Sequence, residues 1–295
     1  MSGARPSDAR LYFLLILMLL IWSLNYVIGK VALREFPPLL LVGLRMAIAG
    51  VFILPIYLWR RQDKHDAWTW LEFRRVLLLG IFGVAGNQLF FVVGLAWTSV
   101  AHAAIVVTLM PVMVLLFSAF LRHEHITARK IAGMLTAAAG VAVLQLSKDR
   151  SSGATLTGDC FIFLSVFSFA IFTVIGKQLT KRHAGVTVNT IAYAGGGFAL
   201  LPMTFSLASH FEFGRVSAAA WWSLIYMAVF AAVIAYLIYY YALTYFPASR
   251  VSAFSYLQPL VATLFAIVLI GEHVSTALVI GGILVLSGVY VTEHA

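Results

Sequence analysis

Charged residues are scarce in this chain, because Asp, Glu, Lys and Arg together make up only 11% of its 295 residues. Soluble domains contain about 25% charged and about 45–50% apolar residues, since their surface must face water. Here 62% of the residues are hydrophobic. This composition excludes a soluble enzyme, a disordered chain and a disulfide-rich secreted domain, and it indicates a protein embedded in lipid.

Cysteine is almost absent too, since Cys160 stands alone. It cannot form an internal disulfide, and we interpret it as a small packing residue rather than a metal ligand. Acidic residues are also few, with 11 Asp and Glu against 20 Lys and Arg. In a membrane protein such an excess of basic residues gathers in cytoplasmic loops, so we expect no nucleic-acid partner. No motif indicates a cofactor.

Long apolar runs, by contrast, are abundant. A bilayer core takes about 20 apolar residues per helix, and backbone groups in lipid must bond internally, which favours helices. We therefore predict an all-α integral membrane protein with ten transmembrane helices. The largest polar linkers, 60–75 and 148–157, leave no room for a soluble domain. The predicted spans are 11–30, 39–59, 76–96, 101–121, 130–147, 158–178, 187–208, 219–243, 250–271 and 276–292.

The distribution of Lys and Arg predicts the orientation of the chain. A cytoplasmic N-terminus places most of these residues in inside loops, for example the five between Arg60 and Arg75. Positive loops remain cytoplasmic, so we predict an inner (plasma) membrane protein with both termini in the cytoplasm. We expect the first span to be retained rather than cleaved as a signal peptide, because it is long and no small-residue cleavage site follows it.

The two halves of the chain repeat each other. The segment Val27–Lys30 recurs 147 residues later as Val174–Lys177. Pro111 and the pair Glu124–His125 recur 148 residues later as Pro259 and Glu272–His273. We predict two copies of five helices, 1–147 and 158–295, joined by a linker at 148–157. An odd number of spans makes the second copy enter the membrane from the opposite side, and transporters built in this way bind substrate between the copies.

Several short motifs occur in order along both copies. They include Trp22–Asn25, Gly29–Lys30, Leu44–Arg45, Leu95–Ala101, Pro247–Arg250 and Leu257–Pro259. Together they resemble the EamA transporters of the drug/metabolite transporter superfamily over essentially the whole chain. The resemblance implies a permease for small metabolites, often amino acids or related amphiphiles, and frequently an exporter. It does not specify a substrate. The chain departs from its own symmetry at His102, whose counterpart is Arg250.

Polar and aromatic residues share faces within several spans. Asn or Gln in mid-span is disfavoured against lipid, so these side chains are expected to face the protein interior. There they either bond neighbouring helices or line a central cavity. Phe91 and Ser165 accompany them on the third and sixth spans. The residues that we predict for the cavity are Trp22, Asn25, Tyr26, Asn87, Gln88, Phe169, Tyr236, Tyr239, Tyr240, Ser255, Tyr256 and Gln258.

Arg45 is the basic residue that lies well inside a span, and two interpretations stay open. It contacts a substrate anion, or it is a snorkelling or helix-pairing arginine, which the resemblance favours. Lys30 and Lys177 end equivalent spans, where we expect interfacial anchors. Pro111 and Pro259 interrupt the helical hydrogen bonding at equivalent positions and are candidate paired hinges or static kinks.

No Asp or Glu lies in the middle of a span, since Asp159 begins one and Glu124 and Glu272 end two. A proton-driven pump usually needs a buried titratable group, so this pattern favours facilitated diffusion or exchange. We interpret His102 as a helix-end histidine rather than a proton relay.

The sequence thus predicts an inner-membrane permease that moves small, partly apolar metabolites by alternating access. The aromatic residues favour a cargo that stacks on rings, such as an amino acid or a cationic aromatic. We expect a monomer, no enzymatic activity, and as partners a small-molecule substrate and membrane lipid. Two alternatives remain: a lipid-acting membrane enzyme, for which clustered acid–base residues are lacking, and an accessory subunit that transports nothing.

Overall fold

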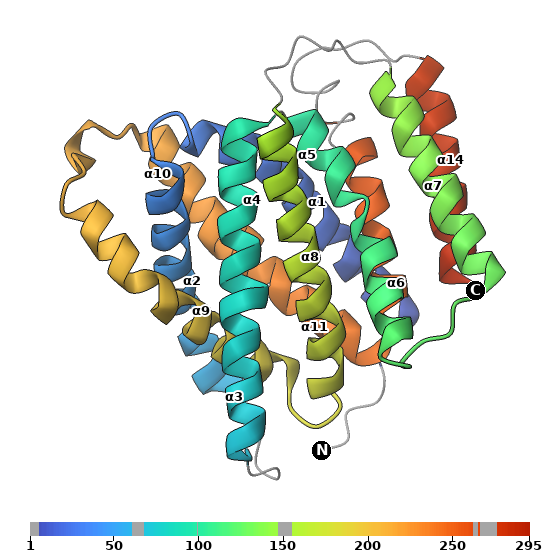
Figure 1. Cartoon of the computed structure of the whole chain (residues 1–295), viewed down its shortest axis with the longest axis horizontal. Coiled ribbons are helices and arrows are strands. Elements are labelled where there is room, and N and C mark those ends of the chain that lie inside the picture. Colours follow the sequence, from blue (N-terminus) through green and yellow to red (C-terminus); the bar gives the residue numbers. More distant parts are fainter. Residues whose placement is uncertain (1–5, 61–67, 99, 147–154, 262–264, 266–275) are drawn as a thin grey trace.

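A computed structural model describes residues 6–60, 68–98, 100–146, 155–261, 265 and 276–295, and over these residues it contains helices and no strand (Figure 1). The first half consists of α1 (Asp8–Ala32), α2 (Pro38–Arg60), α3 (Trp70–Leu79), η1 (Gly80–Ala85), α4 (Gly86–Trp97), α5 (Val100–Val107), α6 (Met110–Phe120) and α7 (Ala128–Leu146). The second half consists of α8 (Leu156–Leu179), α9 (Gly185–Ala208), η2 (Phe213–Arg215), α10 (Ala218–Tyr226), η3 (Met227–Ile234), α11 (Ala235–Tyr245), α12 (Ala248–Ala253), η4 (Phe254–Tyr256) and α14 (Thr276–Glu293).

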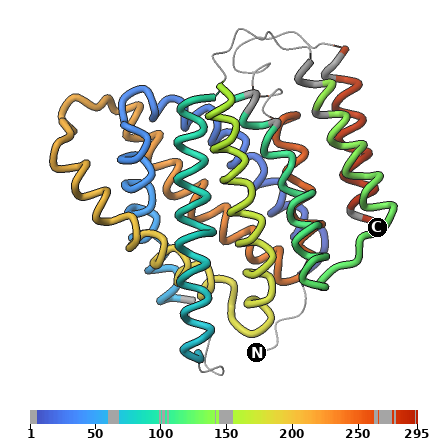
Figure 2. Tube along the Cα trace, in the orientation of Figure 1, coloured from blue at the N-terminus to red at the C-terminus, as the bar shows by residue number. Residues whose placement is uncertain are grey.

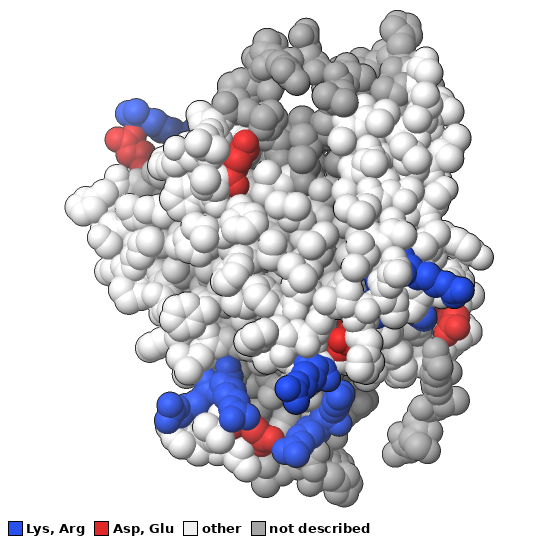
Figure 3. All heavy atoms as spheres, turned by 45° about the vertical axis from the view of Figure 1, so that its right-hand side comes forward, with Lys and Arg blue, Asp and Glu red and all other residues white. Residues whose placement is uncertain are grey.

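Six helical stretches of the described chain are long and apolar enough to cross a membrane. Two further helices, Met110–Phe120 and Val279–Thr292, are apolar but shorter. On the face shown in Figure 3, a broad band lacks charged residues, and Lys and Arg gather mainly toward the lower end. These features are those of a multi-pass membrane protein. The six stretches are Asp8–Ala32, Pro38–Trp59, Trp70–Trp97, Leu156–Leu179, Gly185–Ala208 and Ala218–Tyr245.

Two of the predicted spans are not single continuous helices. In 101–121, α5 ends at Val107 and α6 begins at Met110. Pro111 stands in the first turn of α6, where its missing N–H is tolerated and its ring ends the preceding helix. In 250–271, α12 passes into the 3-10 turn η4, and helix resumes at 257–261. The rest of that span, with Glu272 and His273, lies outside the described residues.

The third predicted span begins earlier than the sequence indicated. Its helix starts at Trp70 because Thr69 forms a capping box with Glu72: Thr69 Oγ1 accepts from the Glu72 amide, and Glu72 Oε2 accepts from the Thr69 amide, both at 3.2 Å. The polar linker is therefore shorter than 60–75. The same helical stretch contains the π-helix η1, and the stretch Ala218–Tyr245 contains the π-helix η3 at a matching position, which begins 147 residues later. Sequence periodicity did not reveal either π-helix.

Helices from the two halves pack against each other throughout the molecule. α2 lies on α9, α4 on α8, and α1 on α10 and α11. α7 and α14 form a closely packed pair at one side (Figure 2). Their backbones touch, since a Cβ added to Gly288 would lie 2.3 Å from the Ala137 amide nitrogen. Only glycine leaves room for this contact. In other membrane proteins, too, small residues at helix interfaces allow the backbones to approach closely.

Candidate functional site

The interior holds a cavity of about 60 Å³, several times the ~10–15 Å³ that is needed to admit one water molecule. Side chains from helices of both halves form its wall. Its lining residues are Trp22, Asn25, Tyr26, Arg45, Asn87, Gln88, Phe91, Val107, Met110, Ser165, Val166, Phe169, Tyr236 and Gln258. The wall thus combines aromatic rings, four amides, several hydroxyls and one guanidinium.

A chain of hydrogen bonds joins α4, α8 and α11 at this cavity. Asn87 Nδ2 donates to the carbonyl oxygen and the Oγ of Ser165, at 3.0 and 2.8 Å. The Tyr236 hydroxyl donates to Asn87 Oδ1 at 2.8 Å and accepts from Gln88 Nε2 at 3.0 Å. The side chains of Asn87, Gln88 and Tyr236 are all buried. Such a network fixes the position of each polar group, because a buried donor or acceptor without a partner is costly.

Trp22 is the aromatic centre of the wall. Its ring centroid lies 5.7 Å from those of Phe169 and Tyr236, with both pairs close to perpendicular. Its indole Nε1 donates to the carbonyl oxygen of Ala231 at 3.0 Å. Ala231 belongs to the π-helix η3, whose irregular hydrogen bonding leaves backbone oxygens open to side chains. Across the cavity, Tyr26 donates to Gln258 Oε1 at 2.8 Å.

Eight of the twelve residues predicted for the cavity line it, and the other four do not. Tyr239 lies behind Trp22, with its hydroxyl 2.9 Å from that of Thr173. Tyr240 donates to the Phe172 carbonyl oxygen at 3.1 Å. Ser255 donates to Met110 Sδ at 3.5 Å, and Tyr256 is fully buried. Sequence reasoning missed Val107, Met110 and Val166, since an apolar residue looks the same whether it faces a cavity or lipid.

Arg45, on α2, is deeply buried, with 2% of its surface exposed. It therefore does not snorkel to the membrane surface. Its Nε and Nη1 atoms have no hydrogen-bond partner among the described residues. Arg45 lines the cavity, and none of the other lining residues is acidic.

The two equivalent lysines bind neighbouring helix ends rather than lying free at the surface. Lys30 Nζ donates to the carbonyl oxygen of Thr98, the C-cap of α4, at 2.6 Å. Lys177 Nζ donates to that of Phe246, the C-cap of α11, at 2.8 Å, and also to Leu243. Each cation thus meets the negative end of a neighbouring helix.

Two glutamates cap helices of the second half. Glu35 accepts from the backbone nitrogen and the Oγ of Ser217, the N-cap of α10, both at 2.6 Å. These hydrogen bonds lower the pKa of Glu35. Glu124 accepts from the backbone nitrogen and the Oγ of Ser249 in α12, and from Lys130 Nζ at 3.0 Å. Burial alone acts to raise the pKa of Glu124, but these hydrogen bonds outweigh it and hold the pKa below its ordinary value.

Metal ligands do not gather anywhere in the described part of the chain, which contains no group of three His, Cys, Asp or Glu residues able to hold an ion. Cys160 is exposed rather than packed inside, which corrects our interpretation of it. The side chain of His102 lies outside the described residues.

The fold and this cavity define a multi-pass membrane protein with a polar and aromatic interior site. The sequence profile of the EamA-like transporter family matches residues 9–146 and again residues 156–293, so the chain belongs to this family and carries its domain twice. The resemblance drawn from the short motifs is thereby confirmed.

Relatives of known sequence extend over nearly the whole chain. An uncharacterized transporter of Archaeoglobus fulgidus is 30% identical over 293 residues, covering 97% of this chain and 98% of that protein. A Salmonella typhimurium protein named "Probable amino-acid metabolite efflux pump" is 25% identical, covering 95% and 93%. A solved crystal structure at 21% identity covers 98% of both chains with a TM-score of 0.75, and this likeness shows the fold alone.

Proposed function

We propose that the protein is a permease that exports small, partly apolar metabolites, such as amino acids or other amphiphilic compounds, and that it is not an enzyme. The observation that carries this proposal is the interior cavity, to which both copies of the family domain contribute polar and aromatic side chains. Rings such as Trp22 and Phe169 suit the apolar part of a cargo, and the amides suit its polar part.

The proposed architecture is ten transmembrane helices in two inverted copies, 1–147 and 158–295, with a linker at 148–157. Trp22 and Phe169 stand at equivalent positions, 147 residues apart, and their rings are in contact. Equivalent residues can touch only near the axis that relates the copies, so this contact supports a site on the axis. The matching π-helices η1 and η3 support the same relation. An axis in the membrane plane lets the copies exchange conformations and open the cavity to either side.

Pro111 and Pro259 are the proposed hinges of this movement. Pro111 follows the break between α5 and α6, and Pro259 follows the change from α12 to η4. The two irregular segments meet, since Ser255 contacts Met110. A movement at the break between α5 and α6 is therefore expected to displace the segment of α12 and η4 as well.

The proposed location is the inner membrane, with both termini cytoplasmic. This proposal rests on the loop distribution of Lys and Arg. Membrane lipid is then the protein's surroundings, a small molecule its cargo, and a monomer the expected unit, with no nucleic-acid partner.

Counterflow in proteoliposomes tests the proposal. The purified protein is offered labelled amino acids, nucleobases and aromatic cations, with and without a pH gradient. Wild-type protein is expected to exchange one of these classes, and insensitivity to the gradient would support facilitated diffusion or exchange. Trp22→Ala removes the ring on which the apolar part of a cargo would lie, a contact worth ~0.5–1.5 kcal/mol, and is expected to slow counterflow by about two- to tenfold.

Trp222→Ala is the matched control, because the Trp222 side chain is exposed and does not line the cavity. It is expected to retain wild-type counterflow. Equal counterflow by Trp22→Ala and Trp222→Ala would show that the cargo does not pass through the cavity at Trp22. No counterflow from folded wild-type protein would contradict the proposal and favour an accessory subunit.

A further inference from the structure

Arg45 brings a permanent positive charge into the cavity, and no acidic side chain in the described wall balances it. A guanidinium remains protonated in proteins. Its Nε and Nη1 atoms are buried and have no hydrogen-bond partner in the described residues. A buried charge left unpaired is among the most costly features of a protein interior, so an anionic partner is expected from outside the chain.

The charge stands on one side of the cavity only. The position equivalent to Arg45 in the second copy, 147 residues later, is Ala192. Ala192 packs directly on η1, since a Cβ added to Gly80 would lie 2.1 Å from its carbonyl oxygen. The site therefore has a positive side, at α2, that the repeat does not duplicate. A ligand with one anionic end has a defined orientation there.

The cavity also holds an acceptor without a donor. Asn25 is buried, lines the cavity, and its Oδ1 has no hydrogen-bond partner among the described residues. The other three amides have partners: Asn87 donates to Ser165, Gln88 donates to Tyr236, and Gln258 accepts from Tyr26. The buried groups of the described wall that have no hydrogen-bond partner are thus a guanidinium edge and an amide oxygen. Their chemical complement is a carboxylate beside an N–H or O–H donor.

The volume of the cavity agrees with such a group. At about 60 Å³ the cavity is several times larger than the ~10–15 Å³ that admits one water molecule, so it can take a small polar group such as a carboxylate. The rings of Trp22, Phe169 and Phe91 form the apolar part of the wall against which a side chain can lie.

We propose that Arg45 binds the carboxylate of the transported molecule and that Asn25 Oδ1 accepts from the amine or hydroxyl next to it. The substrate class is then small α-amino or α-hydroxy carboxylates with an apolar side chain, and cationic amphiphiles are excluded. This inference rests on the proposed transport function and narrows it.

Matched ligands test the inference. The probes are the neutral L-amino acids, the corresponding α-hydroxy acids, the acids without the α-substituent, and the amino acid amides, which keep the amine and lose the carboxylate. Each is measured by counterflow and by thermal stabilisation of the purified protein. At least one amino or hydroxy acid is expected to be transported, and its amide at least about tenfold less well, because a hydrogen bond to a charged group is worth ~1.5–3 kcal/mol.

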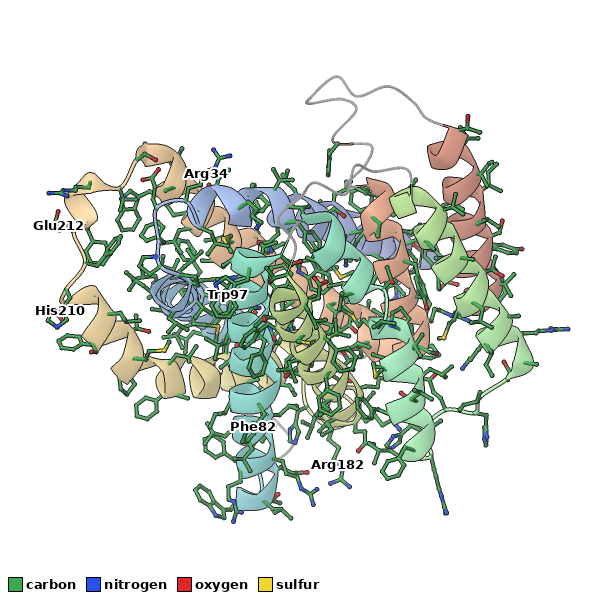
Figure 4. All side chains as sticks on the ribbon, turned by 45° about the horizontal axis from the view of Figure 1, so that its top comes forward. Arg34, Phe82, Trp97, Arg182, His210 and Glu212 are labelled. Carbon is green, nitrogen blue, oxygen red and sulfur yellow. The ribbon has the colours of Figure 1, made fainter. Side chains whose placement is uncertain are left out.

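Variants identify the binding groups. Arg45→Gln is expected to lose transport and ligand-induced stabilisation by about tenfold or more, and Arg45→Lys to keep part of both. Asn25→Leu is expected to abolish the preference for the α-substituted acid over the unsubstituted one. Arg34→Gln is the control, since Arg34 is exposed at the end of α1 (Figure 4).

The melting temperature of the ligand-free protein shows whether Arg45 binds a ligand or supports helix packing. If Arg45 is a ligand-binding residue, Arg45→Gln is expected to leave this melting temperature unchanged or to raise it, because binding groups are often kept at the expense of stability. A large drop without ligand would assign Arg45 to helix packing and overturn the inference.

Other outcomes also decide between the two proposals. Transport of an amide or an aromatic cation that is unaffected by Arg45→Gln would overturn the carboxylate assignment and leave the permease proposal standing. Stabilisation by chloride alone, with no response to any carboxylate, would also overturn it. If folded wild-type protein transports none of these ligands and is stabilised by none of them, the permease proposal itself is contradicted.

Discussion

Gln88 donates a hydrogen bond of 3.0 Å to the hydroxyl of Tyr236, the residue that stands 148 positions later in the chain. This is the offset that relates the two halves around Pro111 and Pro259. The two copies therefore meet through side chains at corresponding positions, which have diverged from each other. At this contact the amide of the first copy supplies the donor and the hydroxyl of the second copy the acceptor.

Tyr236→Phe tests this meeting point. The variant keeps the ring but leaves Asn87 Oδ1 without its donor and Gln88 without its acceptor, at an expected cost of ~1–3 kcal/mol in stability. Counterflow is expected to fall as well. Thermal unfolding of purified protein measures the first effect, with the exposed Tyr290→Phe as control. Loss of stability equal in both variants would contradict the network.

Lys30→Met and Lys177→Met test the role of the equivalent lysines. Each variant leaves helix-end carbonyls at Thr98 or Phe246 without their cation, which is expected to lower stability by ~1–3 kcal/mol. Cargo selectivity is expected to stay the same, because neither lysine lines the cavity. Lys181→Met, at an exposed position, serves as control. A changed selectivity at normal stability would make the lysines substrate contacts.

Glu124 predicts a pH dependence. Its pKa is lowered in the folded protein, so its bonds to Ser249 and Lys130 contribute stability above the pKa of an unfolded glutamate, about 4.3. That contribution is lost as the pH falls through the lower folded pKa. Melting temperature measured from pH 7 to pH 3 is expected to fall more steeply for wild type than for Glu124→Gln. If the melting temperatures of wild type and Glu124→Gln fall in parallel with pH, Glu124 does not stabilise the helix cap as a carboxylate.

The proposed ten-span arrangement of inverted copies predicts on which side of the membrane Ala295 and Gly214 lie. A reporter at Ala295 is expected to read cytoplasmic. A reporter inserted at Gly214, exposed between α9 and α10, is expected to read periplasmic. Signals from the same side at both positions would overturn the ten-span topology.

The long helices could be predicted from the sequence, and their irregularities could not. Apolar runs locate α1, α2, α8 and α9 to within a few residues, because lipid imposes both length and composition. The π-helices η1 and η3 escape such reasoning, since an extra residue in a helical turn is stabilised by the neighbours that pack on it. Pro111 signals an interruption, but only the surrounding packing decides that α5 ends at Val107.

The residues of the candidate site also fall into those that could be predicted from the sequence and those that could not. Asn87 and Gln88 are recognisable because a polar amide in mid-span must turn away from lipid. Their partners are not recognisable, since these depend on which helices meet. Tyr239 carries the same sequence signal as Tyr236 yet lies behind the wall, where it contacts Thr173. A tyrosine can satisfy its hydroxyl in the core as well as in a cavity.

Gly80 offers the sharpest test of the packing that supports the cavity. It lies in η1, and a Cβ there would be 2.1 Å from the backbone oxygen of Ala192 on α9. Because backbone cannot rotate away as a side chain does, Gly80→Ala is expected to separate the two segments and cost ~1–3 kcal/mol of stability. Gly50→Ala is the matched control, since nothing lies within 4 Å of its Cβ position. That substitution in the middle of α2 is expected to be neutral or to stabilise by ~0.5–1 kcal/mol, since alanine favours helix over glycine. Thermal unfolding of both variants measures the difference. If Gly80→Ala unfolds at or above the temperature of Gly50→Ala, then η1 and α9 are not in close contact, and the wall that carries Asn87 and Gln88 is placed differently.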